Sequence, residues 1–367
     1  MRRAGRWPWG LLGMLALVCG VESSVARHGD EFLDMTSVTW ALSDRAVRAE
    51  APGSGVLCFG DSLLKFGLDP AEIERSTGET AYNLAVNAGR APVSYLLLRR
   101  ALAAGARPTA VLVDFEPNIL SQPPLVGPEL WAELAGPRDC LELAFASGGV
   151  DFPARTLVSS LFPTHRYRGQ LRDSILGALG DRPVVRPDDI PALRRDALRN
   201  RGALVMPHTE GGEPVAVDPM NHAFFPGDWH CDPLNRRYLR KFFALASARG
   251  VPVFWVMTPY AAPIQSLRER HGQDATFTRF AAAVRSRFPG VTVLDGRRSG
   301  YDPSVFWDGT VHLDGLGALS LSADVGAVLK RSFAGETLPA WVALPAYRDR
   351  SAGDKTRSEI AVRKSRD

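Results

Sequence analysis

The chain has 367 residues, of which 45% are hydrophobic and 23% are charged, and its formal net charge is +4. The positive charge collects at the two ends, because three arginines precede residue 10 and the segment after Tyr347 carries seven Lys or Arg against four Asp or Glu. The rest is close to neutral, which excludes the basic surface that nucleic-acid binding requires, and the composition is that of a folded globular protein.

The N-terminal segment "MRRAGRWPWGLLGMLALVCGVESSVARHG" has the layout of an export signal. Arginines are followed by an apolar run from about Trp7 to Val21, which is shorter than the roughly 20 residues of a membrane-spanning helix. Ser24, Val25 and Ala26 supply small residues for cleavage. Residues 1–26 are therefore expected to be a signal peptide, or alternatively an uncleaved membrane anchor. Either way the protein is expected to be exported, and so periplasmic, extracellular or anchored facing outward.

Short apolar strands alternate with longer amphipathic segments through the body of the chain, residues 27–346. This alternation predicts an α/β fold with a flavodoxin-like, doubly wound parallel sheet, whose ligands bind at the carboxyl ends of the strands. Strands are expected at Gly55–Phe59, Ala81–Val86, Thr109–Phe115, Val251–Met257 and Val291–Asp295. Helices are expected at Leu63–Ser76, Pro92–Ala104, Arg236–Arg249, Ala275–Phe288 and Gly315–Arg331. The polar tail 347–367 is expected to be disordered.

The stretch "VLCFGDSLLKFG" (56–67) places Gly60, Asp61 and Ser62 between the first strand and the first helix. Such a junction can be a plain helix N-cap, which favours Ser and Asp. It would also hold the Ser62 hydroxyl at the rim of the sheet, where a nucleophile belongs. A serine hydroxyl attacks only when a base removes its proton, so the second interpretation requires a base, an acid that orients it, and donors for an oxyanion.

Two segments after the second and third expected strands can supply those donors. In "YNLAVNAGRAPVSY" (82–95) the backbone N–H groups of Ala88 and Gly89 precede a helix and can face an anion. The sequence leaves open which of the two is the donor. In "VLVDFEPNILS" (111–121) the side-chain amide of Asn118 can donate to a developing oxyanion. Both segments are also good turn sequences on their own.

The stretch from about 119 to 234 is too long for a connecting loop and predicts an inserted subdomain or lid of mainly helical and irregular structure. It contains His165, His208, His222 and His230, which we interpret as surface or structural residues. His222, His230 and Cys231 lack the spacing of a metal site, so no metal is expected. Cys58, Cys140 and Cys231 can form at most one disulfide with one another.

The segment "FWDGTVHLDGLGALSLSADVGAVL" (306–329) places His312 in a loop after the last expected strand. Asp308 lies four residues before it and is predicted to hold one ring nitrogen while the other faces Ser62. Asp314 is predicted instead to cap the last helix. Gly309 can take a positive φ that bulges one extra residue out of the turn. Asp314 or Asp302 against the ring would reject this arrangement.

With these residues the chain resembles the SGNH or GDSL-type esterase/lipase superfamily over about 55–118 and 251–330. The resemblance implies that Ser62 is acylated, that His312 acts as base and then acid, and that Asp308 orients His312. It also implies an oxyanion hole of Ser62, Ala88 or Gly89, and Asn118. The chain departs from the family in Glu116-Pro117-Asn118-Ile119, where Gly-x-Asn-Asp is usual, and in the spacing of four between acid and histidine. These changes resemble a divergent exported branch that includes alginate-type polysaccharide O-acetyltransferases.

The resulting expectation is a serine-dependent esterase or O-acyltransferase that acts without a cofactor on small, acetyl-type esters of carbohydrate or cell-envelope polymers. Hydrolysis and transfer use the same residues, and the sequence leaves that choice open. The alternative is a non-catalytic binding or assembly module of the cell envelope, with the insertion's aromatic residues as its contact surface: Trp131, Phe224, Phe225 and Trp229.

Overall fold

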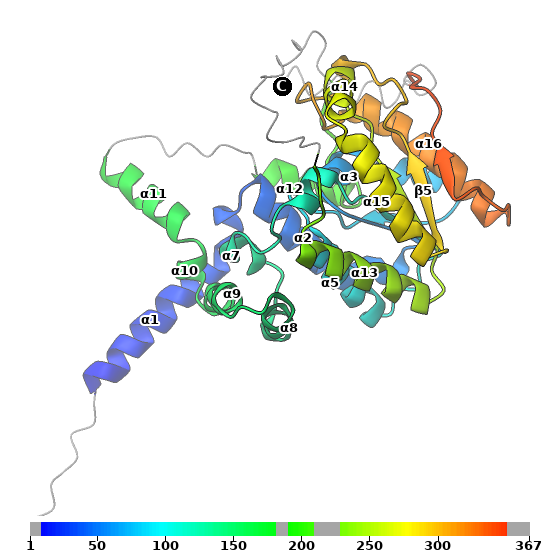
Figure 1. The fold of residues 1–367 in the computed structure, drawn as a ribbon. Coiled ribbons are helices and arrows are strands. Elements are labelled where there is room, and N and C mark those ends of the chain that lie inside the picture. The colour runs from blue at the N-terminus through cyan, green and yellow to red at the C-terminus, as the bar shows by residue number, and fades with distance from the viewer. Residues whose placement is uncertain (1–8, 181–189, 209–227, 351–367) are drawn as a thin grey trace, which may run out of the picture. The chain divides into compact units, whose positions relative to one another are not determined.

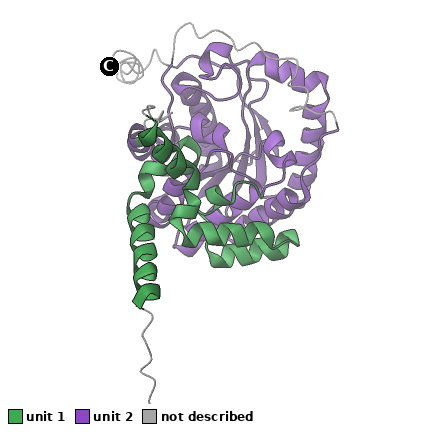
Figure 2. Ribbon diagram, turned by 90° about the vertical axis from the view of Figure 1, so that its left-hand side faces the viewer, with its two compact units in different colours: residues 1–38, 125–190 green, residues 39–124, 191–367 purple. Residues whose placement is uncertain are grey.

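The computed structural model describes residues 9–180, 190–208 and 228–350, and the chain divides into two compact units. Unit 1 comprises residues 1–38 and 125–190, and unit 2 comprises residues 39–124 and 191–367 (Figure 2). The expected insertion, 119–234, is thus shared between the units. Its part after residue 190 packs against the sheet, since the Leu204 N–H donates to the Lys65 carbonyl (3.0 Å) and the Asn83 N–H to the Arg201 carbonyl (2.9 Å).

Unit 2 is built on a six-stranded sheet in which every strand pair is parallel, in the order β2-β1-β3-β4-β5-β6. The strands are β1 (Val56–Phe59), β2 (Ala81–Asn83), β3 (Ala110–Val113), β4 (Val253–Met257), β5 (Val291–Asp295) and β6 (Trp341–Ala343). The predicted α/β class and parallel sheet are confirmed, and the order of the first five strands is compatible with a flavodoxin-like fold. β6 was not expected, because it is a three-residue edge strand in an apolar segment that is interrupted by Pro339 and Pro345.

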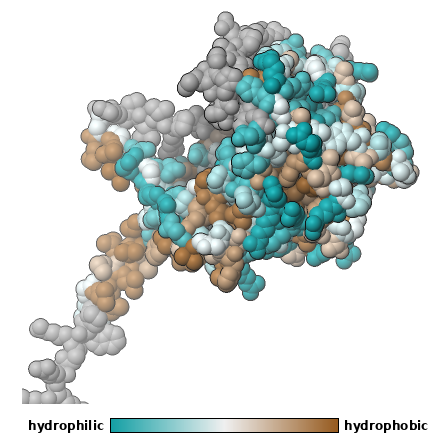
Figure 3. All heavy atoms as spheres, in the orientation of Figure 1, coloured by the Kyte–Doolittle hydropathy of each residue, from teal (hydrophilic) through white to brown (hydrophobic). Residues whose placement is uncertain are grey.

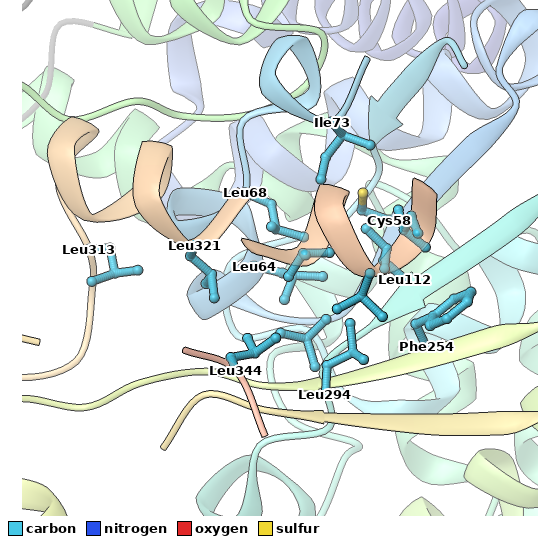
Figure 4. Close-up of a cluster of buried hydrophobic side chains, with 14 of the residues drawn as sticks. Cys58, Leu64, Leu68, Ile73, Leu112, Phe254, Leu294, Leu313, Leu321 and Leu344 are labelled. Atoms are coloured by element: carbon cyan, nitrogen blue, oxygen red, sulfur yellow. The ribbon is translucent and has the colours of Figure 1, made fainter. Parts of the chain in front are cut away.

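Helices cover both faces of the sheet (Figure 1). On one face, Cys58, Leu112 and Phe254 pack with Leu64, Ile73 and Leu321 of the helices α3 (Ser62–Gly67), α4 (Pro70–Thr77) and α16 (Gly315–Phe333) (Figure 4). On the other face, Phe59 contacts Phe242 and Trp255 contacts Phe277. These partners belong to α13 (Pro233–Ala248) and α15 (Gln273–Arg287), and α5 (Ala91–Ala103) packs beside α13. Burial on both faces explains why the strands are apolar throughout.

The predicted helix Leu63–Ser76 is wrong as a single element, because the chain breaks at Leu68 and Asp69. Pro70 has no N–H to continue the first helix, and Asp69 starts the second by accepting a hydrogen bond from the Ala71 N–H (2.9 Å). The other predicted helices are present with shifted ends. The remaining elements are η1 (Gly29–Phe32), α2 (Met35–Ala49), η2 (Ala51–Gly53), α6 (Pro117–Ser121), α12 (Ile190–Arg199), α14 (Ala262–Arg270) and η4 (Pro303–Val305).

Unit 1 is helical and includes the N-terminal helix α1 (Trp9–Arg27). Its other helices are α7 (Pro128–Trp131), α8 (Pro137–Ser147), α9 (Asp151–Leu161), α10 (Pro163–Arg166) and α11 (Arg168–Leu179). Glu22 of α1 accepts a hydrogen bond from the Thr164 N–H at 3.0 Å. In the described part of the chain, α1 alone is long and apolar enough to cross a membrane, and none of its residues is buried (Figure 3). A signal sequence has the same properties.

Candidate active site

The turn after β1 presents Ser62 as the first residue of α3. Asp61 caps this helix, since its Oδ1 accepts a hydrogen bond from the Leu63 N–H at 2.7 Å. Gly60 has a φ of +137°, and a Cβ at this position would lie 1.6 Å from Oδ1 of Asp114. Only glycine therefore lets the chain turn this tightly beside Asp114. The cap that the sequence suggested is real, and it leaves the Ser62 hydroxyl for another role.

Ser62, His312 and Asp308 form a continuous chain of hydrogen bonds. His312 Nε2 lies 2.8 Å from Ser62 Oγ, and His312 Nδ1 lies 2.6 Å from Asp308 Oδ2. The predicted contacts are thus present, although Ser62 and His312 are 250 residues apart in the sequence. The side chains of His312 and Asp308 are about one-fifth exposed, at 22% and 21%, so solutes can reach them.

Asp308 is held in place by the loop that contains it. Its Oδ1 accepts hydrogen bonds from the N–H groups of Thr310 (2.9 Å), Val311 (3.0 Å) and His312 (3.1 Å). Gly309 has a φ of +68°, as the extra residue between Asp308 and His312 requires. Burial raises the pKa of Asp308, but the hydrogen bonds from His312 and the backbone more than offset it and hold the pKa well below its usual range. Asp308 is therefore an ionised partner for the imidazole.

Two aromatic rings fix the plane of His312. Trp307 stacks on the imidazole with ring centres 5.5 Å apart and planes 21° from parallel. Phe66 of α3 meets it edge-on at 5.3 Å. The side chain of His312 therefore has little freedom to rotate away from Ser62.

The two other candidate acids have different roles in the structure. Asp314 caps α16, since its Oδ1 accepts from the N–H groups of Leu316 (2.9 Å) and Gly317 (3.0 Å). Its Oδ2 lies 2.6 Å from Nδ1 of His208, a pair that the sequence did not indicate. Asp302 caps η4 through the Ser304 N–H. Neither takes the place of Asp308.

The loop after β2 distinguishes the two candidate backbone donors. The Gly89 N–H donates to the Val86 carbonyl at 2.9 Å and is thus used within the turn. The Ala88 N–H makes no hydrogen bond within the described residues, and Ala88 has a φ of +55°, which is uncommon for a residue with a side chain. A Cβ on Gly89 would lie 2.4 Å from the Gly60 carbonyl oxygen, so this loop packs directly against the turn that precedes Ser62. Ala88 is therefore the better candidate for the oxyanion donor.

Asn118 lies in the first turn of α6, immediately after β3, and is half-buried. Its Oδ1 accepts a hydrogen bond from Nε2 of Gln273 at 3.1 Å. Ser62, Ala88 and Asn118 thus follow β1, β2 and β3, which are neighbours in the sheet, at their common carboxyl edge. From β1 the chain continues to β2 on one side of the sheet and then to β3 on the other side. Ligands bind at such a switch point in open α/β sheets.

Several residues that sequence reasoning missed support this edge. Asp114 accepts hydrogen bonds from the Asp61 N–H (2.8 Å) and the Leu64 N–H (3.1 Å), one on each side of Ser62. Burial and the nearby acidic groups raise the pKa of Asp61 well above its usual range, and burial raises that of Asp114 to about 7. The only sequence signal for Asp114 is its place directly after a buried strand.

Lys65 is a further buried ionisable residue near Ser62. Its Nζ donates to the Gly202 carbonyl at 2.7 Å, and burial lowers its pKa to about 7. This contact ties α3 to the segment beside β2. No sequence signal indicates this contact, because a lysine in an amphipathic helix usually faces solvent.

The structure describes four of the residues considered for metal or polymer binding: Trp131, Trp229, His230 and Cys231. His230 is exposed whereas Cys231 is buried, and the described residues contain no cluster suited to a metal ion. The four cysteines are all free thiols. Trp131 and Trp229 are buried at 1% and 4% exposure, so they belong to the core rather than to a contact surface. His222, Phe224, Phe225 and residues 351–367 of the tail lie outside the described residues.

Comparison with models of known protein families gave no match, and comparison with curated protein sequences gave none either.

Proposed function

We propose that this protein is a serine-dependent esterase or O-acyltransferase of the SGNH type that works through an acyl-enzyme on Ser62. The observation that supports this most strongly is the continuous series of hydrogen bonds from Asp308 through His312 to Ser62. A serine, a histidine and a partly buried, ionised aspartate in this order are the groups that activate a hydroxyl for acyl transfer.

In the proposed first step, Ser62 Oγ bonds to the carbonyl carbon of the ester while His312 Nε2 takes the hydroxyl proton. The carbonyl oxygen becomes an oxyanion, which would accept hydrogen bonds from the N–H groups of Ser62 and Ala88 and from Nδ2 of Asn118. The tetrahedral intermediate then releases the alcohol as its C–O bond breaks, and His312 returns the proton to that oxygen. Asp308 stays ionised and stabilises the imidazolium between the two transfers.

In the second step, His312 Nε2 takes the proton of an acceptor hydroxyl as its oxygen bonds to the acyl carbon. The bond between that carbon and Ser62 Oγ then breaks, and His312 returns the proton to Oγ. Water as acceptor gives hydrolysis, whereas a sugar hydroxyl gives acyl transfer, and both use the same three residues. The family resemblance points to acetyl esters of carbohydrate or cell-envelope polymers. It also fits an exported protein, because the N-terminal segment has the composition of a signal or anchor.

The decisive experiment is reaction with a serine-directed fluorophosphonate, followed by mass spectrometry of the labelled peptide. A working base and oxyanion hole should direct the label to Ser62, and Ser62→Ala should remove both labelling and turnover of an acetyl ester such as p-nitrophenyl acetate. The fold should survive this change, because Asp61 and not Ser62 caps α3. Turnover that persists in Ser62→Ala would disprove the proposal, and an unreactive wild-type Ser62 would favour a binding module.

A further inference from the structure

Two buried side chains, Arg268 and Gln273, form a hydrogen-bonded row with the half-buried Asn118, the candidate oxyanion donor. Arg268, on α14, donates from Nε to Oε1 of Gln273 at 3.2 Å. Gln273, at the start of α15, donates from Nε2 to Oδ1 of Asn118 at 3.1 Å. Arg268 and Gln273 are both fully buried at 0% exposure, so water does not replace either partner. The row joins α6 to α14 and α15, two consecutive helices that are far from α6 in the sequence.

The chemistry of the three groups allows one arrangement of this row. Arginine has N–H donors and no acceptor, so the atom of Gln273 that faces Arg268 must be the amide oxygen. The other end of that amide is then NH₂, which donates. The atom of Asn118 that meets it must therefore be the side-chain oxygen. It follows that Nδ2 of Asn118 is turned away from Gln273.

Arg268 itself is firmly held. Its guanidinium lies 4.1 Å from the centre of the Tyr260 ring, and Nη2 is 3.2 Å from Oδ1 of Asp274. The Tyr260 hydroxyl donates to Oε1 of Glu116 at 2.8 Å. Glu116 Oε2 in turn accepts from the Ile119 N–H at 2.8 Å, which caps the helix that carries Asn118. The network thus fixes α6 through its backbone and Asn118 through its side chain.

We propose that Arg268 and Gln273 are positioning residues that set which end of the Asn118 amide faces the reacting carbonyl oxygen. This inference rests on the proposed function, in which Asn118 Nδ2 donates to the oxyanion. An asparagine amide that is rotated by half a turn would present its oxygen instead, and would repel the oxyanion. Arg268, which does not touch the substrate in this scheme, determines the polarity of the oxyanion hole through two hydrogen bonds.

The direct test is Gln273→Glu, which changes the size of the side chain very little. A carboxylate has acceptors only, so it can keep the bond from Arg268 but can no longer donate to Asn118. Asn118 must then turn its NH₂ group toward Glu and its oxygen toward the substrate. We expect kcat for p-nitrophenyl acetate to fall by about 10²–10³-fold with little change in KM, as for loss of an oxyanion donor.

Gln273→Met is the matched control, because it retains length and burial but can make no hydrogen bond to the Asn118 amide. That amide is then free to take either orientation, so we expect a smaller fall in kcat than in Gln273→Glu. Equal losses in the two variants would show that only packing matters at this position, and would overturn the proposal. Thermal unfolding of both variants identifies any loss that comes from misfolding.

Two further measurements separate positioning from a general structural role. In an Asn118→Ala background, Gln273→Glu should have no additional effect on kcat, and additive losses would contradict the proposal. The ¹⁵N side-chain amide signal of Asn118, assigned by its absence in Asn118→Ala, should shift in Gln273→Glu. If Gln273→Glu does not fold, the same double-variant comparison is made with Gln273→Met.

The outcome is distinguishable from failure of the proposed function. If the wild-type protein does not react with the fluorophosphonate at Ser62, the proposed function fails. If Ser62 reacts and the wild type turns over ester, but Gln273→Glu retains full kcat and full labelling rate, the positioning role alone is wrong.

Discussion

At the scale of single residues, Asp308 and Asp314 flank His312 and both lie within hydrogen-bond distance of a histidine. Asp308 pairs with His312 itself, whereas Asp314 pairs with His208 and caps α16. Each aspartate uses one oxygen for backbone N–H groups and the other for an imidazole. The two carboxylates thus make similar contacts, and only one of them is connected to Ser62.

Substitution of these two aspartates should have unequal effects on activity. Asp308→Asn should lower kcat by about 10⁴-fold, because an amide at this position favours the wrong tautomer of His312. Asp314→Asn should have little effect, because asparagine is a good helix cap and His208 is not connected to Ser62. Steady-state ester hydrolysis by the two variants checks this, and equal losses would show that the His208 pair also takes part.

Asn118→Ala tests the oxyanion donor without the complication of amide orientation. We expect kcat to fall by about 10²–10³-fold while KM stays nearly constant, because the hydrogen bond strengthens only as charge develops on the carbonyl oxygen. Ester kinetics over a range of substrate concentrations provide the measurement. A change that appears only in KM would make Asn118 a substrate-binding residue.

At the scale of elements, the junction of β1 and α3 rests on buried carboxyl groups. Burial raises the pKa values of both Asp61 and Asp114, and the charges of Asp114 and Glu116 raise that of Asp61 further, so the folded protein keeps a proton that the unfolded chain gives up near pH 4. The unfolding free energy should therefore fall as the pH rises from about 4 to about 7. Asp308, whose pKa is lowered, loses its stabilising contribution only below about pH 4.

Denaturant unfolding at pH 4.5 and pH 7 tests this effect of the acidic pair. The wild type should lose stability between the two values, and Asp114→Asn should lose less, because the remaining Asp61 no longer faces a second carboxyl group. Asp173→Asn, at an exposed site on α11, is the matched control and should behave as the wild type does. An Asp114→Asn variant with the wild-type pH dependence would contradict the assignment.

The elements also show what can be predicted from the sequence. Ser62, His312 and Asp308 were identifiable as candidates because Ser62 follows a strand and precedes a helix, and because Asp308 and His312 share one loop after the last expected strand. Gln273 was not, since its partner Asn118 is 155 residues away and glutamine at a helix start carries no signal. Pro70 signals the break between α3 and α4, but the apolar pattern continues across it, and for that reason a single helix was predicted. The choice between Ala88 and Gly89 required the hydrogen bond inside the turn.

At the scale of the whole molecule, the sheet and its site belong to unit 2, and the apolar helix α1 belongs to unit 1. Most apolar side chains of α1 are exposed, and the helix is long enough to cross a membrane. We therefore expect the uncleaved chain to associate with lipid through α1.

Co-flotation of the full chain with phospholipid vesicles tests the anchor. Leu15→Arg, in the middle of α1, should reduce the bound fraction strongly, because an arginine at the centre of a membrane helix costs about 3 kcal/mol. The matched control is Leu179→Arg, at the end of α11, where the leucine is 80% exposed and outside α1. Equal flotation of both variants would exclude α1 as the anchor.

The end of β3 has a mechanical consequence for the site. Asp114 holds the Ser62 turn and Glu116, two residues later, holds the helix of Asn118. When β3 shifts with thermal motion, both the turn that carries Ser62 and the helix that carries Asn118 are carried along, so their separation should change little. His312 arrives on a loop after β5 and does not share this support. On warming, the alignment of Ser62 with His312 for proton transfer should therefore be lost first, while the proposed oxyanion hole keeps its shape.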